Sequence, residues 1–153
     1  MGLFGLLAQK ISQAQRRTPS FGFRFSRASG TSPSEAIVVL PPTDLARARA
    51  TFREFYVKTS PNPEAAASAI SACSGNSNLE AFNDEMMFSS DKAQYLNERF
   101  GPNGVKWGSA GKEGLDPTGV HRQTIAFPDG RSLTLFFDLS RLAFPKGYQP
   151  IFF

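Results

Sequence analysis

Residues 121–139, HRQTIAFPDGRSLTLFFDL, constrain the fold more than any other stretch of the chain. Apolar and polar residues alternate on both sides of Asp129-Gly130, and a period of two places successive side chains on opposite faces of a strand. An Asp-Gly pair supplies the positive φ angles that a tight hairpin turn needs. The segment therefore predicts a β-hairpin with one core face. Phe136 falls on the other face and is a candidate contact residue.

The preceding sequence is mostly patterned for helices. AIVVL at 36–40 is a short apolar run that ends at a Pro-Pro pair, which predicts a buried strand. Helical spacing and capping signals then predict four helices: one over 44–58 capped by Thr43, one from Pro63 to before Gly75 capped by Asn62, one opening at Ser77 or Asn78, and one over 91–100 capped by Ser90. The predicted fold class is α+β, with about four short helices packed on a small antiparallel sheet.

Residues 101–119, GPNGVKWGSAGKEGLDPTG, interrupt these patterns. The many glycines and two prolines predict a long loop held by one aromatic anchor, Trp107. The GSAGKEG stretch does not fit a phosphate-binding loop, because Glu113 stands where Ser or Thr binds magnesium and no predicted strand precedes it.

Charge is distributed unevenly along the chain. Residues 1–34 contain five basic residues and no acidic one, whereas residues 35–153 contain twelve basic and thirteen acidic residues. We therefore predict two parts: a basic amphipathic leader or arm over 1–34, and a compact α+β domain over 35–153 that ends in an aromatic tail.

The start of this leader has helical spacing. Leu3, Phe4, Leu7 and Ile11 share one stripe, with Arg16 and Arg17 in the last turn before Pro19. A helix this short needs a surface: an import receptor or membrane interface, a partner protein, or the body of the same chain. The acid-free, Arg-rich composition is typical of an organellar transit segment, which predicts a mitochondrial or plastid location, or otherwise a cytoplasmic one. There is no classical secretory signal.

Aromatic residues are concentrated in two further segments. Phe21, Phe23 and Phe25 alternate with polar residues, so an extended arm would present three rings on one face for protein pockets, or for stacking on single-stranded nucleic acid. Residues 26–35 resemble a flexible linker in composition. The tail SRLAFPKGYQPIFF over 140–153 is too aromatic to be solvated, so we expect it to fold back on the body or insert into a neighbouring protein.

The chain contains one cysteine, Cys73, and one histidine, His121, which excludes an internal disulfide and multi-histidine or multi-cysteine metal sites. We expect Cys73 to be a small buried hydrophobe and His121 to be structural or solvent-facing, with a catalytic Cys73–His121 dyad as the less favoured alternative. Carboxylates on the predicted helices are expected on solvated faces; these are Asp84, Glu85, Asp91 and Glu98. We therefore predict no enzyme, no cofactor and no metal.

These observations favour a non-catalytic structural, linker or accessory subunit of a large protein assembly, docking through the basic arm and the aromatic tail. The alternatives are a nucleic-acid-associated accessory protein, for example of an organellar ribosome, and, less favoured, a small enzyme or effector with an unfamiliar site. Residues 1–17 could also contact a membrane surface. The candidate partner-binding residues are Leu3, Phe4, Leu7, Ile11, Arg16, Arg17, Phe21, Phe23, Arg24, Phe25, Arg27, Trp107, Phe136, Phe144, Tyr148, Phe152 and Phe153.

Overall fold

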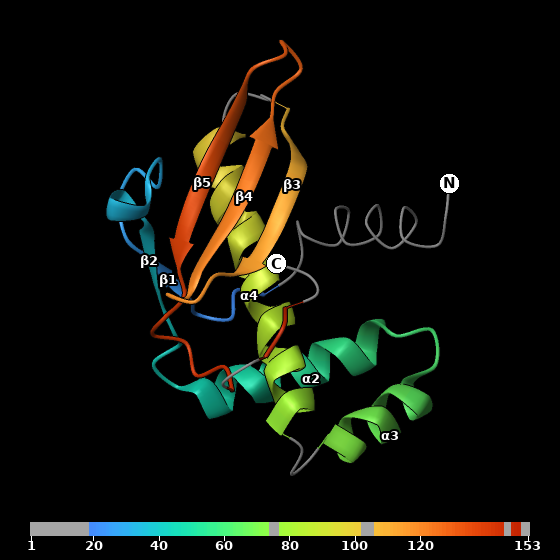
Figure 1. Cartoon of the computed structure of the whole chain (residues 1–153). Coiled ribbons are helices and arrows are strands. Elements are labelled where there is room, and N and C mark those ends of the chain that lie inside the picture. Colours follow the sequence, from blue (N-terminus) through green and yellow to red (C-terminus); the bar gives the residue numbers. More distant parts are fainter. Residues whose placement is uncertain (1–18, 74–76, 102–105, 146–147, 151–153) are drawn as a thin grey trace.

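The computed structural model describes residues 19–73, 77–101, 106–145 and 148–150. Within them the fold combines three α-helices with a five-stranded mixed sheet, so the α+β class is confirmed (Figure 1). The helices are α2 (Leu45–Thr59), α3 (Pro63–Cys73) and α4 (Ser77–Phe100), and a short 3₁₀ helix, η1, spans Pro33–Glu35. The strands are β1 (Arg24–Phe25), β2 (Ile37–Leu40), β3 (Gly108–Leu115), β4 (Val120–Ala126) and β5 (Ser132–Asp138).

The sheet has the strand order β1-β2-β5-β4-β3. The predicted hairpin is present as β4 and β5, which pair antiparallel through a turn with Gly130 at φ 89°. The sheet is nevertheless mixed, because β2 runs parallel to β5. Parallel neighbours need a long crossover, and the three helices that lie between β2 and the hairpin in sequence supply it.

The number of helices differs from the prediction because residues 77–100 form one helix, α4, and not two. Buried residues recur along it without interruption, at Ala81, Glu85, Phe88, Lys92 and Leu96. A serine caps a helix only where the chain leaves the helical conformation, and here the continuous buried stripe keeps Ser90 inside the helix. The α2 cap also shifts by one residue, since the Asp44 Oδ1 accepts from the Arg47 amide at 3.0 Å.

The predicted loop over 101–119 is wrong in its second half, where Gly108–Leu115 forms β3 at the edge of the sheet. Glycine disfavours strands, but edge positions and bulges accept it. The β3–β4 register shifts between Ser109 and Gly111 and again between Glu113 and Leu115. Trp107 precedes the strand and is anchored as predicted, since its Nε1 donates to Asn97 Oδ1 at 3.0 Å.

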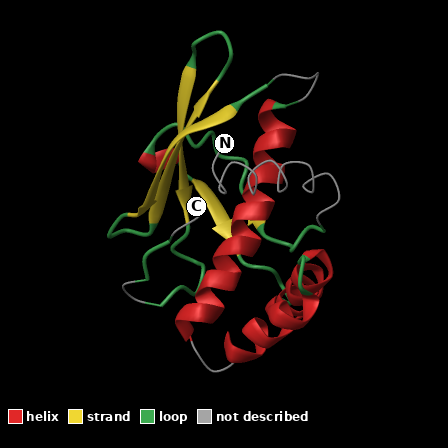
Figure 2. Ribbon diagram, turned by 90° about the vertical axis from the view of Figure 1, so that its right-hand side faces the viewer, coloured by secondary structure: helices red, strands yellow, loops and turns green. Residues whose placement is uncertain are grey.

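All three helices lie on one side of the sheet (Figure 2). The long helix α4 packs against the sheet across a core that contains Phe88, Leu96, Ile125, Leu135 and Phe137. A second cluster, Phe21, Ala48, Phe52 and Met87, joins α2 to α4. On the other side, which we call the open face, the part of the chain that the structure describes contributes no α-helix, only η1 and its neighbouring loop.

Residues 19–34 belong to the compact body and not to an arm in front of it. Phe21 is 4% exposed and lies in the α2–α4 cluster, and β1 pairs with β2. The segment predicted as a linker is also tied down, because the Phe136 amide donates to the Gly30 carbonyl at 2.8 Å. The domain therefore starts earlier than the predicted boundary at residue 34. No helix among the described residues is long and apolar enough to span a membrane.

Candidate docking surface

The three phenylalanines of the predicted arm pack against the chain's own core, with Phe21 buried and Phe23 and Phe25 partly buried. The amides of Phe21 and Phe23 donate to Asp91 Oδ1 and Oδ2, each at 3.0 Å, and Phe25 stacks on Tyr95 with ring centroids 4.7 Å apart. Asp91 is buried, contrary to the expected solvated position, and desolvation raises the pKa of its carboxyl while the backbone hydrogen bonds oppose that rise. These rings are therefore used in folding.

The two arginines of the same segment remain at the surface. Arg24 is exposed, and its Nη2 donates to the Pro41 carbonyl at 3.2 Å. Arg27 is exposed as well. The contrast with the phenylalanines follows from strand alternation, which turns Arg24 away from the core that receives Phe23 and Phe25.

The C-terminal segment folds back on the body as far as Pro150. Leu142 is buried, and the ring of Phe144 stacks on that of Tyr148 at 5.4 Å. The Tyr148 hydroxyl donates to Oε1 of Glu85 at 2.8 Å, and Glu85 is fully buried on α4. Burial and this carboxylate raise the pKa of Tyr148 well above its ordinary value. The fold-back alternative thus holds for these residues.

A buried polar contact that the sequence did not predict joins α4 to β4. Lys92 Nζ lies 3.1 Å from His121 Nε2, and both residues are buried. The ammonium also lies 5.8 Å from the Phe88 ring centroid and 5.9 Å from that of Phe137. His121 therefore lies in the interior of the fold, between α4 and β4 and within hydrogen-bond distance of Lys92. The sequence feature that could have indicated the burial of Lys92 is its position on the same helical stripe as Phe88 and Glu85.

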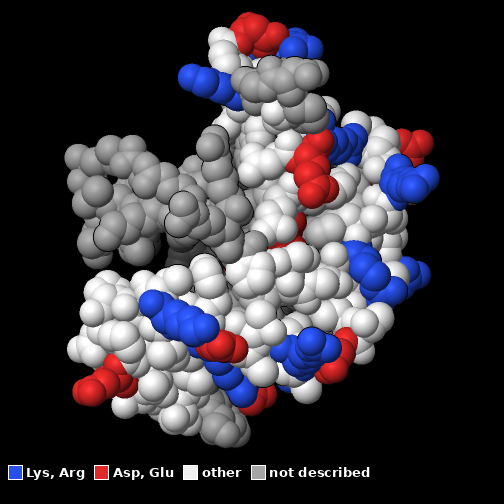
Figure 3. Space-filling model, turned by 180° about the vertical axis from the view of Figure 1, so that it is seen from behind, with Lys and Arg blue, Asp and Glu red and all other residues white. Residues whose placement is uncertain are grey.

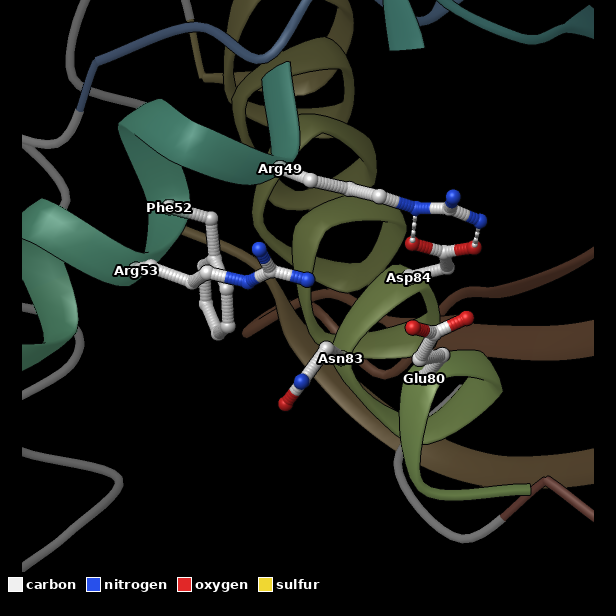
Figure 4. Close-up of a pocket in the computed structure, with 6 residues that line it drawn as sticks. All are labelled: Arg49, Phe52, Arg53, Glu80, Asn83 and Asp84. Carbon is white, nitrogen blue, oxygen red and sulfur yellow. Dashed lines mark hydrogen bonds and ion pairs between the residues drawn. The ribbon is translucent and has the colours of Figure 1, made fainter. Parts of the chain in front are cut away.

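A second charged contact joins α2 to α4 (Figure 4). The guanidinium of Arg49 donates through Nε and Nη2 to the two oxygens of Asp84, at 3.0 and 2.7 Å, and this pairing raises the pKa of Arg49. Figure 4 shows Arg53 and Glu80 beside the same contact. The space among these side chains has a cavity volume of about 0 Å³, so the cluster fastens two helices and leaves no room for a ligand.

The open face of the sheet contains a hollow of about 340 Å³. Phe136 is half-buried in it, and the carbon at the centre of the Arg122 guanidinium lies 6.0 Å from the Phe136 ring centroid. The two residues are direct partners in the β4–β5 register, so the pair is set by the hairpin itself. The hollow is lined by Pro33, Gly114, Leu115, Asp116, Val120, Arg122 and Phe136.

Asp116 shapes one wall of this hollow. Its Oδ1 accepts from the Thr118 amide at 2.8 Å, the Thr118 hydroxyl at 2.6 Å and the Val120 amide at 2.9 Å. These hydrogen bonds, chiefly that of the Thr118 hydroxyl, lower the pKa of the Asp116 carboxyl. The carboxylate thus holds the β3–β4 turn in place. Arg122 is the one basic residue among those that line the hollow.

No family model, curated protein or solved structure matches this chain. The assignment of a site therefore depends on the geometry. Among the predicted contact residues that the structure describes, Phe136 is the one that lines the hollow, and Arg122, Val120, Leu115 and Pro33 are neighbours that the sequence did not identify. The predicted contact residues Leu3, Phe4, Leu7, Ile11, Arg16, Arg17, Phe152 and Phe153 lie outside the described residues.

Proposed function

We propose that this protein is a non-catalytic accessory or linker subunit of a larger protein assembly, and that it docks a partner on the open face of its sheet. The observation that supports this proposal is the Phe136–Arg122 pair in a hollow of about 340 Å³ on the face that the helices leave uncovered. Aromatic residues and arginine are enriched at the energetic centres of protein interfaces. The half-buried ring of Phe136 beside the guanidinium of Arg122 is therefore suited to anchor a partner protein.

The other aromatic segments pack within the fold, which favours the open face as the docking surface. The rings of Phe21, Phe23 and Phe25 and the described part of the tail pack within the fold. Of the predicted docking elements, Phe136 on the open face, residues 1–17 and the terminal Phe152 and Phe153 stay in the proposal. We keep the basic segment as a second contact, with a partner subunit or a membrane surface, and an organellar location as part of the proposal.

A nucleic-acid-associated function is the second candidate. An aromatic side chain and an arginine on an open sheet resemble the stacking platforms of single-strand-binding domains. Basic side chains do not predominate among the described residues of this face, however, since Arg24 and Arg122 are accompanied by Asp116 and Asp138. On the opposite side of the molecule, basic and acidic side chains are interspersed (Figure 3). Phosphate binding favours clustered cations, so a protein partner is the better match.

The experiment compares Phe136→Ala with Tyr56→Ala in a host that expresses the full chain. Tyr56 is 38% exposed on α2, so it provides a matched surface aromatic away from the hollow. We expect the wild type and Tyr56→Ala to migrate in a large complex on size exclusion and Phe136→Ala to migrate as free protein. Loss of the complex in both variants, or in neither, would contradict the proposed docking surface.

A photo-crosslinker supplies a direct readout of the same surface. Thr134 lies on β5 two residues from Phe136, on the same face of the strand, whereas Arg47 is exposed on α2. We expect a crosslinker at position 134 to capture one defined protein and a crosslinker at position 47 not to capture it. Crosslinks to nucleic acid from position 134 would support the second candidate instead.

A further inference from the structure

The hollow on the open face is suited to an apolar occupant. Most of its wall is formed by apolar residues, which are Pro33, Leu115, Val120 and Phe136. Its volume of about 340 Å³ lies near the lower end of the range for ligand pockets, about 300–1,000 Å³. A space of this size accepts a short segment with large side chains, and not a folded surface.

The two charged residues among those that line the hollow are already engaged within the chain. The guanidinium of Arg122 lies over the ring of Phe136, with its central carbon 6.0 Å from the ring centroid. The Asp116 Oδ1 accepts from the Thr118 hydroxyl and from the amides of Thr118 and Val120. A charged occupant would lose its hydration without a partner reserved for it, whereas burial of an apolar side chain needs no such partner.

The C-terminal segment leads to the wall of this hollow. Tyr148 is held to α4 by its hydrogen bond to Glu85 at 2.8 Å. Two residues later, Pro150 Cδ lies 3.7 Å from the position that a Cβ would take on Gly114, and Gly114 lines the hollow. The next residues in the sequence, 151–153, are Ile-Phe-Phe. An extended chain advances about 3.3–3.6 Å per residue, so these three residues reach about 10 Å beyond Pro150.

Resting on the proposed function, we infer that Ile151, Phe152 and Phe153 occupy the hollow of their own chain, and that a partner must displace them in order to dock. The contact is apolar, between these side chains and the ring of Phe136 with its apolar neighbours. A segment on so short a tether has an effective concentration in the millimolar range, so it competes strongly with a separate molecule for the same space. Once displaced, the two terminal rings are available for a contact on the partner.

Disulfide trapping tests where the segment lies. The full-length chain carries Cys73→Ser, which removes its one cysteine, and Phe152→Cys is combined either with Val120→Cys in the hollow or with Arg47→Cys on α2. Because a disulfide needs its Cα atoms within about 7 Å, we expect the 120–152 bond to form and the 47–152 bond not to form. The yield of the 120–152 bond within one chain should be independent of protein concentration.

Three results of the trapping experiment would overturn the inference. These are equal yields for the two cysteine pairs, no 120–152 bond at all, and a 120–152 bond that joins two chains with a yield rising with protein concentration. The last result would assign the hollow to the C-terminal segment of a second copy.

A competition measurement tests whether the segment closes the hollow. The probe is acetyl-Gln-Pro-Ile-Phe-Phe-amide, titrated into the full-length ¹⁵N-labelled chain while the amide resonances of Val120 and Phe136 are followed. We expect the Phe152→Ser/Phe153→Ser variant to bind the probe at least about tenfold more tightly than the wild type, because its own segment no longer competes. Tyr56→Ser is the matched control, since it removes an exposed ring on α2 and should bind the probe as the wild type does. Equal binding by the wild type and the double variant, or an equal gain in Tyr56→Ser, would refute the inference.

The inference and the proposed function fail on different results. If a crosslinker at position 134 captures a partner and the 120–152 disulfide does not form, the docking surface stands and the inference is wrong. If the disulfide forms and position 134 captures no protein, the segment occupies the hollow, but the proposed function fails and displacement by a partner fails with it.

Discussion

Asp91 offers the sharpest test of how residues 19–25 are held to the body. Its two carboxylate oxygens accept from two different backbone amides, those of Phe21 and Phe23, each at 3.0 Å. Asp91→Asn preserves the shape of the side chain but retains a single acceptor oxygen. The NH₂ group would then face one of the two amides, so a buried N–H would be left without a partner.

The expected loss of stability follows from this geometry. An unsatisfied buried donor costs about 1–3 kcal/mol, and replacing a charged acceptor by a neutral one weakens the remaining hydrogen bond by about 1 kcal/mol. Asp91→Asn also removes a buried carboxylate whose desolvation raises the pKa of Asp91, and this relief offsets part of the lost stability. We therefore expect a net loss of about 2 kcal/mol in the free energy of unfolding, a measurable share of the ~5–15 kcal/mol of a domain.

Urea denaturation at neutral pH measures this loss, and amide hydrogen exchange at Phe21 and Phe23 locates it. Asp129→Asn is the control, because Asp129 also accepts from a backbone amide, that of Arg131, but at the exposed hairpin tip. A variant whose stability falls by less than about 0.5 kcal/mol, within the range of ordinary surface substitutions, would refute the reasoning. So would unchanged protection of the two amides.

The pH dependence of the same variant has a defined sign. The folded pKa of Asp91 is raised above the ordinary 3.8, so the folded state binds this proton at a higher pH than the unfolded state does. The group therefore adds stability as the pH falls through its folded pKa, and the addition is complete below 3.8. We expect the stability difference between wild type and Asp91→Asn to grow in that direction. A difference that shrinks on acidification would contradict the raised pKa.

Two further predictions concern the backbone and the C-terminal segment. Gly30→Ala should destabilise the protein by about 3 kcal/mol, because Gly30 has φ +74° and an added Cβ would lie 2.6 Å from Cδ1 of Ile37. Gly108→Ala is the control and should be tolerated, because a Cβ added there meets no atom within 4 Å. Thermal melts compare the two variants. Tyr148→Phe removes the hydrogen bond to Glu85 and should lower the free energy of unfolding by about 1 kcal/mol. The substitution should also make that free energy less dependent on pH in the alkaline range. The folded pKa of Tyr148 is raised from the ordinary 10.0, so stability from this group is lost as the pH rises above 10.0; equal alkaline sensitivity of the two proteins would count against it.

The hairpin shows which features of the fold local sequence patterns predict and which they do not. Alternation and the Asp-Gly pair identify both strands, but the loop has three residues, 128–130, since the Phe127 amide donates to the Arg131 carbonyl. This loop places Phe136 opposite Arg122. A two-residue turn would instead place it opposite Gln123, whose side chain faces the core. A shift of one residue in register thus decides whether the open face has an aromatic–arginine pair.

Long-range contacts account for what the sequence did not predict. The alternation of Phe21, Phe23 and Phe25 correctly predicts an extended segment. No local sequence feature indicates that the carboxylate of Asp91, about seventy residues later in the chain, accepts hydrogen bonds from the backbone amides of this segment. The same holds for Lys92 and His121, whose burial depends on the packing of α4 against β4. Strand β3 illustrates the reverse case, because its glycine-rich sequence disfavours a strand and only pairing with β4 at the sheet edge stabilises it.

The parallel pairing of β2 with β5 has a consequence for synthesis of the chain. Ile37 pairs with Phe137, so the centre of the sheet joins residues one hundred positions apart and closes only when the hairpin has been made. Until then Phe88 and Leu96 on α4 lack the surface against which they pack in the finished protein. Late closure of this kind slows folding and leaves apolar side chains accessible to chaperones on the ribosome. The emergence of the final strand is therefore the event that commits the nascent polypeptide to its native topology.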